Sequence, residues 1–562
     1  MSAPRSPDSA SATPYNEKEI IELAWQEGHD ADIPSNAGFV AEDSAKDADS
    51  FSGSADRDLE KGGKPGSVNS STVEESKITH TADIEECQPS STVEPTAADP
   101  DVVDWDGPDD PANPMNFSGK VKVIHIAILS LLTLVTPLAS SMFAPGVPEV
   151  MRDFKTDSAT LASFVVSVYI LGFAFGPLAV APMSELYGRY WIYTICNALF
   201  IIFTVACALA QNMAQLCVFR FFAGAFGVAP ITIGSGTIAD MIAPQKRGGA
   251  MAIWAIGPLL GPVIGPVAGG YLSVAAGWRW VFWTLAIVSG VCCICCFFFT
   301  RETYAPVLLA RKAAKLRKET GNTALHSKLD NGLSPRDLFK RSIVRPTKML
   351  LLSPIVAAMS VYMAVAYGIM YLLFTTFTFV FIDYYGFTES NVGLVYIGTG
   401  IGMLLGLVVL GAVSDKLSLR LAAKNGGEMK PEYRLPPLII AGPFIPAGLF
   451  IYGWGADKHV QWALPLFGTL LVGIGMIGLF MCIQTYLVDA FTIHAASAIA
   501  ANTVLRSIVG AILPLCGLRM YDALGLGWGN SLIGFIALAL VPIPVLFYKY
   551  GEAIRRRTKV KL

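Results

Sequence analysis

The sequence predicts an all-α membrane protein in which twelve transmembrane helices form two pseudo-symmetric six-helix bundles. Three observations predict this fold class. Hydrophobic residues make up 53% of the 562 residues, charged residues 15%, and the mean hydropathy is +0.50. Long apolar stretches alternate with short polar loops from about residue 121 to residue 550. A basic segment separates these stretches into two sets of six, which indicates an internal structural repeat.

Each apolar stretch has the length that a membrane crossing demands. A hydrocarbon core of roughly 30 Å needs about 20 apolar residues in a helix. Twelve stretches of the sequence meet this requirement. Their expected limits are 122–144, 160–182, 190–210, 214–237, 249–273, 280–299, 351–381, 391–413, 436–455, 463–486, 495–520 and 527–548.

Residues 1–118 differ from the rest of the chain in charge. They hold 26 Asp and Glu against seven Lys and Arg, whereas the remainder holds 18 against 35. A segment so acidic and so poor in aromatic residues cannot bury enough apolar surface to fold alone. We therefore expect a disordered acidic N-terminal tail. The regions after it are expected at 119–300 (first bundle), 301–350 (central loop), 351–549 (second bundle) and 550–562 (basic C-terminal tail).

The orientation follows from the basic residues close to the spans. They gather in alternate loops, at 120–122, 189, 246–247, 301–345, 416–434 and 555–561. Loops rich in Lys and Arg stay on the cytoplasmic side of a membrane, so both termini and the central loop are expected there. The chain does not open with a basic region followed by a short apolar one, so a cleaved signal peptide is not expected.

The fifth span carries glycines at four-residue spacing, and prolines directly follow three of them. Each proline removes a backbone donor, which neighbouring helices can compensate inside a bilayer. Glycines four residues apart let another helix approach closely. The pattern predicts a bent hinge helix whose close interface seals the two halves, with an ordinary packing helix as the alternative. The residues are Gly257, Pro258, Gly261, Pro262, Gly265, Pro266 and Gly269.

A polar motif recurs after the second and the eighth spans. The first copy places Glu185 three residues before a glycine turn, Gly188, which Arg189 follows directly. The second, degenerate copy retains Asp415 and Lys416. A carboxylate and an arginine beside a turn can form a charge clasp with the ends of neighbouring helices. A solvated turn that only sets the topology is the alternative.

The fourth span contains Arg220 four residues before Gly224. Together with the two motifs above, this pattern resembles the major facilitator superfamily, in particular its fungal twelve-span drug:proton antiporters. The resemblance covers nearly everything after residue 110. The chain departs from the family's loop motif at Ala181, where a glycine is expected, and at Tyr190, where a further base is expected.

The resemblance implies roles for these motifs. Glu185 and Arg189 would hold a cytoplasmic gate shut in the outward-facing state. The fifth-span run looks like the motif that distinguishes exporters from uptake porters of the same fold. The family also implies the plasma membrane, although vacuolar or peroxisomal placement would need no visible change in the sequence.

Two arginines lie inside predicted spans. Arg220 and Arg506 each carry a charge whose burial in a bilayer costs at least ~2.5 kcal/mol unless it is paired or hydrated. Arg220 could hold a proton-linked partner, bind an anionic group or clamp backbone carbonyls, or it could extend its head toward the outer surface. No Asp or Glu falls near the middle of any predicted span. Asp240, at the end of span four, is the candidate proton relay, and the direct carrier stays unnamed.

The seventh span has an aromatic face made of Tyr367, Tyr371, Phe374 and Phe381. Such a face could line a cavity that binds bulky hydrophobic or cationic compounds, or it could simply pack against other helices. Two uncharged polar side chains fall inside the tenth and eleventh spans, namely Gln484 and Asn502. They could orient a substrate or join two helices by hydrogen bonds.

These observations lead to a function hypothesis. We expect a secondary active transporter that exports small hydrophobic or cationic compounds, such as drugs, toxins or secondary metabolites, by proton antiport and alternating access. No nucleotide-binding loop is present, so ATP is not expected as the energy source. Two alternatives remain: an uptake porter for polyamines or another nutrient, and a nontransporting membrane sensor of the same fold.

The expected partners are a small-molecule substrate and the lipid bilayer, with no nucleic acid, and the chain is expected to be monomeric. No catalytic constellation of an enzyme is found, and no cofactor or metal is expected. Four cysteines cluster in the sixth span, but their neighbours are apolar, and buried free cysteine behaves as a small hydrophobe. These are Cys292, Cys293, Cys295 and Cys296.

Overall fold

The computed structural model describes residues 101–557, apart from 244–245, 331, 333 and 427–428. The side chains of Pro335, Asp415 and Ile493 are likewise outside the description. The predicted disordered tail therefore lies, except for its last 18 residues, outside the described residues. All the described residues belong to one compact unit.

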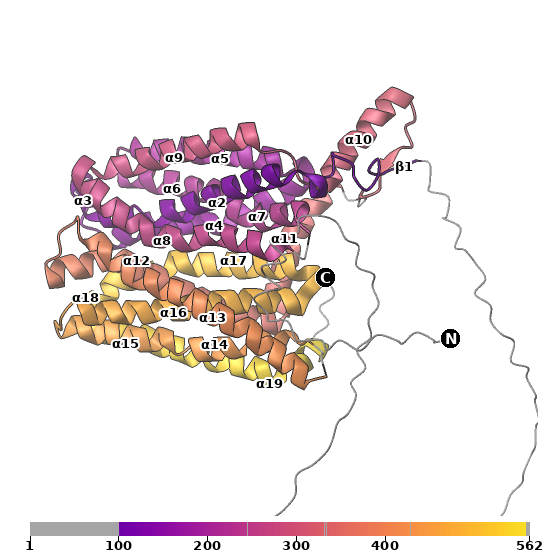
Figure 1. The fold of residues 1–562 in the computed structure, drawn as a ribbon. Coiled ribbons are helices and arrows are strands. Elements are labelled where there is room, and N and C mark those ends of the chain that lie inside the picture. The colour runs from indigo at the N-terminus through magenta and orange to yellow at the C-terminus, as the bar shows by residue number, and fades with distance from the viewer. Residues whose placement is uncertain (1–100, 244–245, 331, 333, 427–428, 558–562) are drawn as a thin grey trace, which may run out of the picture. The chain divides into compact units, whose positions relative to one another are not determined.

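The described chain folds into two layers of helices that lie side by side (Figure 1). The first layer, here the first bundle, is built from residues 119–299. Its helices are α2 (Gly119–Ser141), α3 (Val147–Asp153), α4 (Ala159–Tyr187), α5 (Arg189–Ala208), α6 (Met213–Gly227), α7 (Ala229–Met241), α8 (Arg247–Ala276) and α9 (Trp278–Phe299).

The second bundle is built from residues 354–557. Its α-helices are α12 (Pro354–Tyr385), α13 (Tyr396–Lys424), α14 (Pro436–Ala441), α15 (Phe444–Asp457), α16 (Ala463–Phe491), α17 (Ala495–Ile512), α18 (Gly517–Leu540) and α19 (Pro542–Arg557). Short 3-10 turns connect several of them, among which η4 (Val392–Val395) precedes α13 and η7 (Leu513–Cys516) follows α17.

Two prolines explain where predicted spans are broken, and one glycine marks the boundary between the last two spans. Pro230 and Pro542 stand in the first turns of α7 and α19, where a missing backbone donor costs least. Gly525 interrupts α18 with a φ of 77°. Among the described residues, eleven helical runs are long and apolar enough to cross a membrane, and the last, 495–557, is 63 residues long. Since 63 residues far exceed one crossing, the break at Gly525 is consistent with two crossings and with twelve in all.

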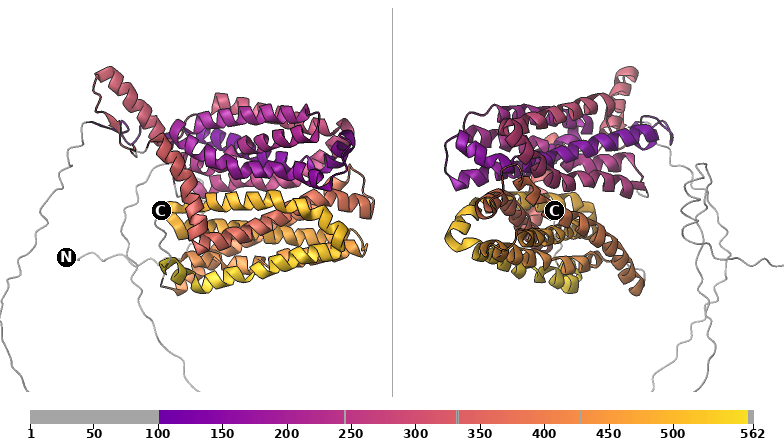
Figure 2. Two further views of the ribbon diagram at one scale, coloured as in Figure 1. Left: turned by 180° about the vertical axis from the view of Figure 1, so that it is seen from behind. Right: turned by 60° about the vertical axis from the view of Figure 1, so that its left-hand side comes forward.

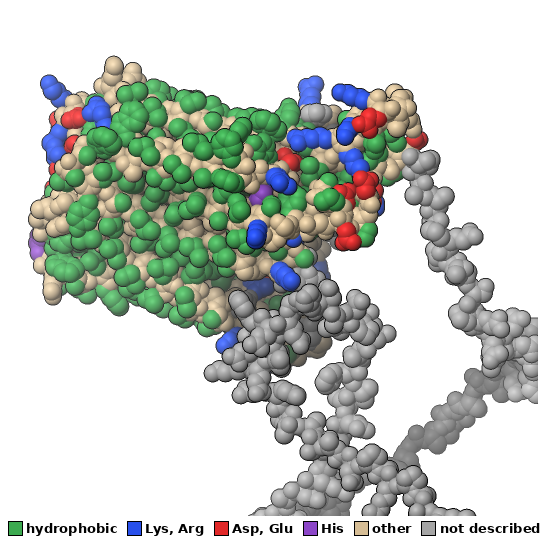
Figure 3. Space-filling view, turned by 45° about the horizontal axis from the view of Figure 1, so that its top comes forward, with side chains coloured by type: hydrophobic (Ala, Val, Ile, Leu, Met, Phe, Trp, Pro, Cys, Tyr) green, Lys and Arg blue, Asp and Glu red, His purple; other side chains and the backbone are tan. Residues whose placement is uncertain are grey.

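On the face seen in Figure 3, a broad apolar belt covers the bundles, and charged side chains gather beyond both of its ends. Many large hydrophobic side chains in this belt are exposed, for example Phe298 at 72% and Val408 at 70%. An apolar surface of this extent would be an aggregation hazard in water, whereas lipid tails would cover it. The belt and the helical runs confirm the predicted all-α membrane fold.

Two names identify the ends of the bundles. The linker end carries Gly188, the segment between the bundles and the last turn of α19, and the far end carries α3 and residues 386–391. The segment between the bundles contains α10 (Ala305–Thr320), a two-residue strand β2 (His326–Ser327) and α11 (Pro335–Leu352). In Figures 1 and 2, α11 runs across the linker end from one bundle to the other.

The segment before α2 docks on this linker. Strand β1 (Val102–Val103) pairs in parallel with β2. Lys312 of α10 donates to the Asp106 carboxylate at 2.6 Å, and Lys328 donates to Asp104 at 2.6 Å. The last residues of the acidic region thus contact basic residues of the central loop.

Candidate functional site

Arg220 of α6 is fully enclosed inside the first bundle. Its side chain is only 1% exposed. Its guanidinium lies 4.7 Å from the ring centre of Phe143 and 5.3 Å from that of Tyr169. One nitrogen donates to the Ser140 carbonyl at 3.3 Å, while Nε has no hydrogen-bond partner among the described residues. Aromatic faces and a carbonyl stabilise this cation, so it does not extend toward the outer surface.

Arg506 of α17 occupies a similar position in the second bundle. Its side chain is 8% exposed, and its guanidinium lies 5.1 Å from the ring centres of both Tyr367 and Phe480. Its Nε also lacks a hydrogen-bond partner within the described part of the chain. As with Arg220, aromatic rings supply its nearest partners.

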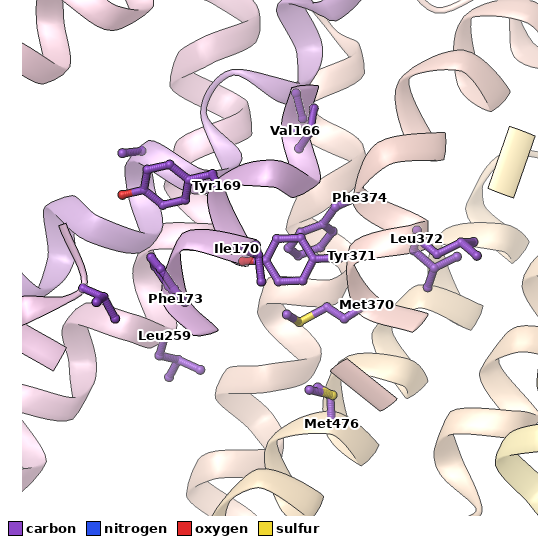
Figure 4. Packing of buried hydrophobic residues seen from close by; sticks show 14 of the residues in the cluster. Val166, Tyr169, Ile170, Phe173, Leu259, Met370, Tyr371, Leu372, Phe374 and Met476 are labelled. Atoms are coloured by element: carbon purple, nitrogen blue, oxygen red, sulfur yellow. The ribbon is translucent and has the colours of Figure 1, made fainter. Parts of the chain in front are cut away.

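A chain of contacts connects the two arginines across the bundle interface. The Ser140 hydroxyl of α2 lies 3.2 Å from the Tyr371 hydroxyl of α12, and the rings of Tyr371 and Tyr367 are 5.1 Å apart. Figure 4 shows Tyr371 beside Ile170 of α4, at the place where the bundles meet. We refer to Arg220, Ser140, Tyr371, Tyr367 and Arg506 as the central layer.

The predicted aromatic stripe divides into two parts. Tyr367 and Tyr371 belong to the central layer. Phe374 contacts both Tyr371 and Tyr396, with ring centres 5.7 and 5.4 Å apart, and Phe381 stacks on Tyr385 at 5.3 Å. Phe374 and Phe381 are both buried inside the second bundle, and a role of either ring in substrate binding stays a prediction.

Of the two polar residues predicted for spans ten and eleven, Asn502 lies one helical turn from Arg506. Asn502 precedes it by four residues and thus shares its face of α17, and it is completely buried. Both polar atoms of the Asn502 amide lack a partner among the described residues, as does the Gln484 carbonyl oxygen. Neither residue makes the predicted interhelical hydrogen bond through these atoms.

A second polar cluster lies at the linker end of the first bundle. The Arg189 side chain donates to Asp240 at 3.2 Å and to the Ser184 hydroxyl at 2.7 Å. Its guanidinium also lies 4.5 Å from the ring centre of Tyr304. Arg189 and Asp240, which were assigned separately to gating and to proton relay, thus form one ion pair that joins α5 to α7.

Glu302 completes this cluster, and its role explains Gly188. The Glu302 carboxylate accepts the backbone N–H groups of Arg189 at 2.8 Å and Tyr190 at 3.3 Å. A Cβ on residue 188 would collide with this carboxylate, and Gly188 has a φ of 97°, which favours glycine. Gly188 therefore lets the carboxylate cap α5.

The predicted charge clasp is only partly assembled. Glu185 makes no ion pair with Arg189 in the described structure. The positive charges of Arg189 and of Arg341 on α11 nevertheless lie near enough to interact with its carboxylate. In the second copy of the motif, Lys416 is exposed, and the side chain of Asp415 lies outside the described residues. The clasp roles of Glu185, Asp415 and Lys416 therefore stay predictions.

The second bundle has an ion pair that corresponds to Arg189–Asp240. Arg434 donates to Asp489 at 3.0 Å, over a sequence separation of 55 residues that resembles the 51 residues between Arg189 and Asp240. Glu432, which is 4% exposed, accepts from Arg555 of α19. The internal repeat is therefore visible in the ion pairs as well as in the helices.

The four glycines of α8 pack inside the first bundle. A Cβ at Gly257 or Gly261 would lie 2.8 Å from backbone nitrogens of α2, and one at Gly269 would collide with the Met142 carbonyl. The helix face that carries these glycines therefore packs within the first bundle, and the prediction that it seals the two halves against each other is wrong. The helix also continues unbroken through Pro258, Pro262 and Pro266.

A different face of α8 meets the second bundle near the far end. The backbone at Pro266 approaches Gly393 so closely that a Cβ there would collide with it, and Val263 contacts Gly400 of α13 in the same way. Beside them, Arg152 of α3 forms a two-bond ion pair with Glu389 at 2.6 and 3.1 Å. The far end is thus closed between the bundles.

Sequence reasoning gave no role to Glu302, Asp489 or the Arg152–Glu389 pair. Glu302 lies directly after span six and Asp489 directly after span ten, and this position at the end of a span is a signal that could have found them. The third had no signal, because two exposed loop residues 237 positions apart carry no periodicity or spacing that relates them.

Known proteins resemble this chain in both sequence and structure. The sequence profile of the Major Facilitator Superfamily matches residues 129–514. The chain is 61% identical over 464 residues to the MFS-type transporter tndD of Aspergillus flavipes, covering 81% of this chain and 86% of that protein. It is 59% identical over 467 residues to the efflux pump radE of Floropilus chiversii, covering 83% and 87%.

Solved structures agree with the fold. The xylose transporter XylE of E. coli, in a partially occluded inward open conformation, matches with a TM-score of 0.58 at 15% identity over 77% of this chain and 98% of its own. A bacterial homologue of the lysosomal transporter Spinster, in an inward-facing conformation, matches with a TM-score of 0.55 at 15% identity over 79% and 99%.

Proposed function

The chain belongs to the major facilitator superfamily, and from this membership we propose that it exports small hydrophobic molecules by proton antiport. It is a membrane transporter rather than an enzyme. The bundles would rock against each other about the central layer, so that substrate has access from one end at a time. The relatives named as efflux pump and MFS-type transporter support the transport class.

One observation carries the proposal: the two ends of the bundle interface are built differently. At the far end, an ion pair and close backbone contacts join the bundles. At the linker end, the pairs Arg189–Asp240 and Arg434–Asp489 each join residues of one bundle. A transporter that opens toward the linker end while the far end is closed would have this distribution of contacts.

We assign the linker end to the cytoplasm and the protein to the plasma membrane. The basic residues of α10, α11 and α19 gather at this end, and such residues mark the cytoplasmic side. Substrate would then enter from the cytoplasm and leave at the far end. The chain would work as a monomer, because each bundle already finds its partner within the chain.

Asp240 remains the proposed proton relay. It is the acidic partner of Arg189, and protonating it would release the arginine from its ion pair. Such a release at the linker end would couple a proton to the movement of α5 and α7. The direct contact of the two side chains gives the relay a defined partner, which sequence reasoning could not supply.

Compound accumulation in cells tests the function. Cells that express the chain are expected to retain less of an uncharged hydrophobic fluorescent compound such as Nile red than control cells, and a protonophore should remove the difference. Undiminished efflux after collapse of the gradient would contradict proton coupling. Higher accumulation would indicate an uptake porter. A chain lacking residues 1–110 should retain its flux, whereas a sensor should lose its output.

A further inference from the structure

The central layer contains two buried cations and no acid. Arg220 comes from the first bundle and Arg506 from the second, and they are 1% and 8% exposed. No Asp or Glu of the described chain forms an ion pair with either guanidinium, whose contacts are aromatic rings and, for Arg220, the Ser140 carbonyl. A buried charge without a counter-charge is costly.

The polar groups around the cations offer several donors. The two guanidinium groups can only donate, and Nε of each is unused. The Tyr371 hydroxyl can donate as well, and both the nitrogen and the oxygen of the Asn502 amide are without a partner among the described residues. Buried polar groups are rarely left unsatisfied unless a ligand or water completes them.

The donors lie where the bundles must separate. The Ser140–Tyr371 contact crosses from α2 to α12, so it has to break when the bundles rock apart. Breaking it frees the Tyr371 hydroxyl between the two guanidinium groups, while the Ser140 hydroxyl keeps its own hydrogen bond to the Pro137 carbonyl at 2.7 Å. The opened interface would thus present several donors and two positive charges, and aromatic faces would surround them.

We propose that the central layer binds the acidic group of an amphipathic substrate, a carboxylate or an acidic phenol or enol, between Arg220 and Arg506. The inference rests on the proposed function and names its substrate class. The anion replaces the Tyr371 hydroxyl between the cations, and its apolar body lies against Tyr367 and Phe480. Since the two arginines belong to different bundles, the bound anion draws the bundles together and favours the occluded state.

This assignment narrows the earlier expectation of hydrophobic or cationic compounds. A cationic substrate would meet two like charges in a low-dielectric layer, which costs free energy. An anion gains charge-assisted hydrogen bonds, which are roughly twice as strong as neutral ones. The central layer therefore selects substrates mainly by their charge and to a smaller extent by their shape.

Binding of three matched probes to the purified full-length protein in lipid nanodiscs tests the proposal. The probes are 1-naphthylacetate, 1-naphthylacetamide and 2-(1-naphthyl)ethylamine, which share an aromatic body and carry a negative, no and a positive charge at pH 7. Equilibrium dialysis of each probe gives the Kd. We expect the acid to bind at least about tenfold more tightly than the amide and the amine.

Variants then locate the site. Arg506→Gln and Arg220→Gln should each weaken naphthylacetate binding by about tenfold or more, whereas Arg506→Lys should keep a preference for the acid. Arg519→Gln is the matched control, because it removes one positive charge from an exposed position of α18. If the glutamine variants do not fold, the ranking of the three probes on the unmodified protein decides alone.

The result that overturns the proposal is equally defined. It is wrong if the amide or the amine binds as tightly as the acid, if the acid does not bind at any soluble concentration, or if Arg506→Gln and Arg519→Gln bind it equally well. Efflux in cells without any preference for acids would leave the proposed function standing and reject this inference alone. Absence of any efflux, with acid binding retained, would reject the proposed function instead.

Discussion

At the far end the two bundles meet through close backbone contacts, whereas at the linker end α11 crosses from one bundle to the other, and α4 packs directly against α17 along the interface. At the far end, Gly393 and Gly400 admit α8 at distances that no side chain would allow. The exposed Arg152–Glu389 pair beside them contributes at most about 1 kcal/mol, so close packing rather than charge closes this end. At the linker end, the ion pairs Arg189–Asp240 and Arg434–Asp489 each lie within one bundle.

This difference separates what holds a bundle together from what joins the bundles. Contacts inside a bundle must persist through transport, while contacts between bundles must form and break. The close contacts on the two faces of α8 belong to these two classes. Gly269 packs on the end of α2 within the first bundle, whereas Pro266 packs on Gly393 of η4 in the second bundle. Substitutions of similar size should therefore have different consequences on the two faces.

The largest effect is expected from added methyl groups at glycines. Gly269→Ala forces a Cβ into the Met142 carbonyl within the first bundle, and overpacking typically costs about 1–3 kcal/mol. We expect a clearly lower unfolding temperature and little folded protein. Gly393→Ala creates the same collision between bundles, which can separate to relieve it, so we expect a folded protein with weakened efflux.

Gly290→Ala is the control for both substitutions, because no atom lies within 4 Å of its added Cβ. It should leave the unfolding temperature and the efflux unchanged. Thermal unfolding in detergent and efflux in cells measure the two quantities. Equal unfolding temperatures for the Gly269 and Gly393 variants would contradict the distinction between the faces.

An intermediate effect is expected from the corresponding ion pairs. Asp240→Asn leaves Arg189, which is 12% exposed, without its carboxylate, and should cost about 1–3 kcal/mol. Asp489→Asn affects a more exposed pair, with side chains 22% and 37% exposed, and should cost about 0–1 kcal/mol. The free energy of unfolding checks the order of the two variants.

The same two variants should differ more in efflux than in the free energy of unfolding. If Asp240 relays protons, Asp240→Asn abolishes proton-dependent efflux, and Asp489→Asn reduces it only slightly. Proton-dependent efflux that survives Asp240→Asn would remove Asp240 from the mechanism and leave its pair with Arg189 a structural one.

The smallest effect is expected where the segment before α2 docks on the linker. Lys328 lowers the pKa of Asp104 below its usual value of 3.8 by a hydrogen bond. A lowered pKa stabilises docking above the ordinary pKa, and this stabilisation is lost as the pH falls through the lowered value. The pair is 59% and 42% exposed, so solvent screening keeps it to a few tenths of a kcal/mol.

Hydrogen exchange of residues 101–106 would measure this docking. A lower protection factor, which corrects the exchange rate for its intrinsic pH dependence, is expected below about pH 4, and Lys328→Ala should show the lower protection factor already at pH 7. An unchanged rate in Lys328→Ala would mean that the β1–β2 pairing alone holds the segment.

Most of the fold could be predicted because each membrane span carries its own signal. Apolar length is local in sequence, so the twelve stretches and their basic loops were visible without knowledge of any contact. The break at Gly525 falls between the expected spans 495–520 and 527–548, although the sequence does not show that the positive φ of a glycine produces it.

The site was predicted less completely, because its contacts are not local. Arg220 and Arg506 were found from the cost of a buried charge, yet nothing in the sequence showed that Ser140 and Tyr371 lie between them. The glycines of α8 were read correctly as a close-packing face, but the sequence does not say which helix that face meets. Glu302 required the fold to bring its carboxylate to the start of α5.

The most direct test of alternating access is a pair of distances measured on one protein. Bio-orthogonal spin labels at 152 and 389 report the far end, and labels at 185 and 434 report the linker end. Double electron–electron resonance, recorded with and without a transported substrate, should show one distance lengthening as the other shortens. Distances that stay constant, or that lengthen and shorten together, would contradict two bundles rocking about the central layer.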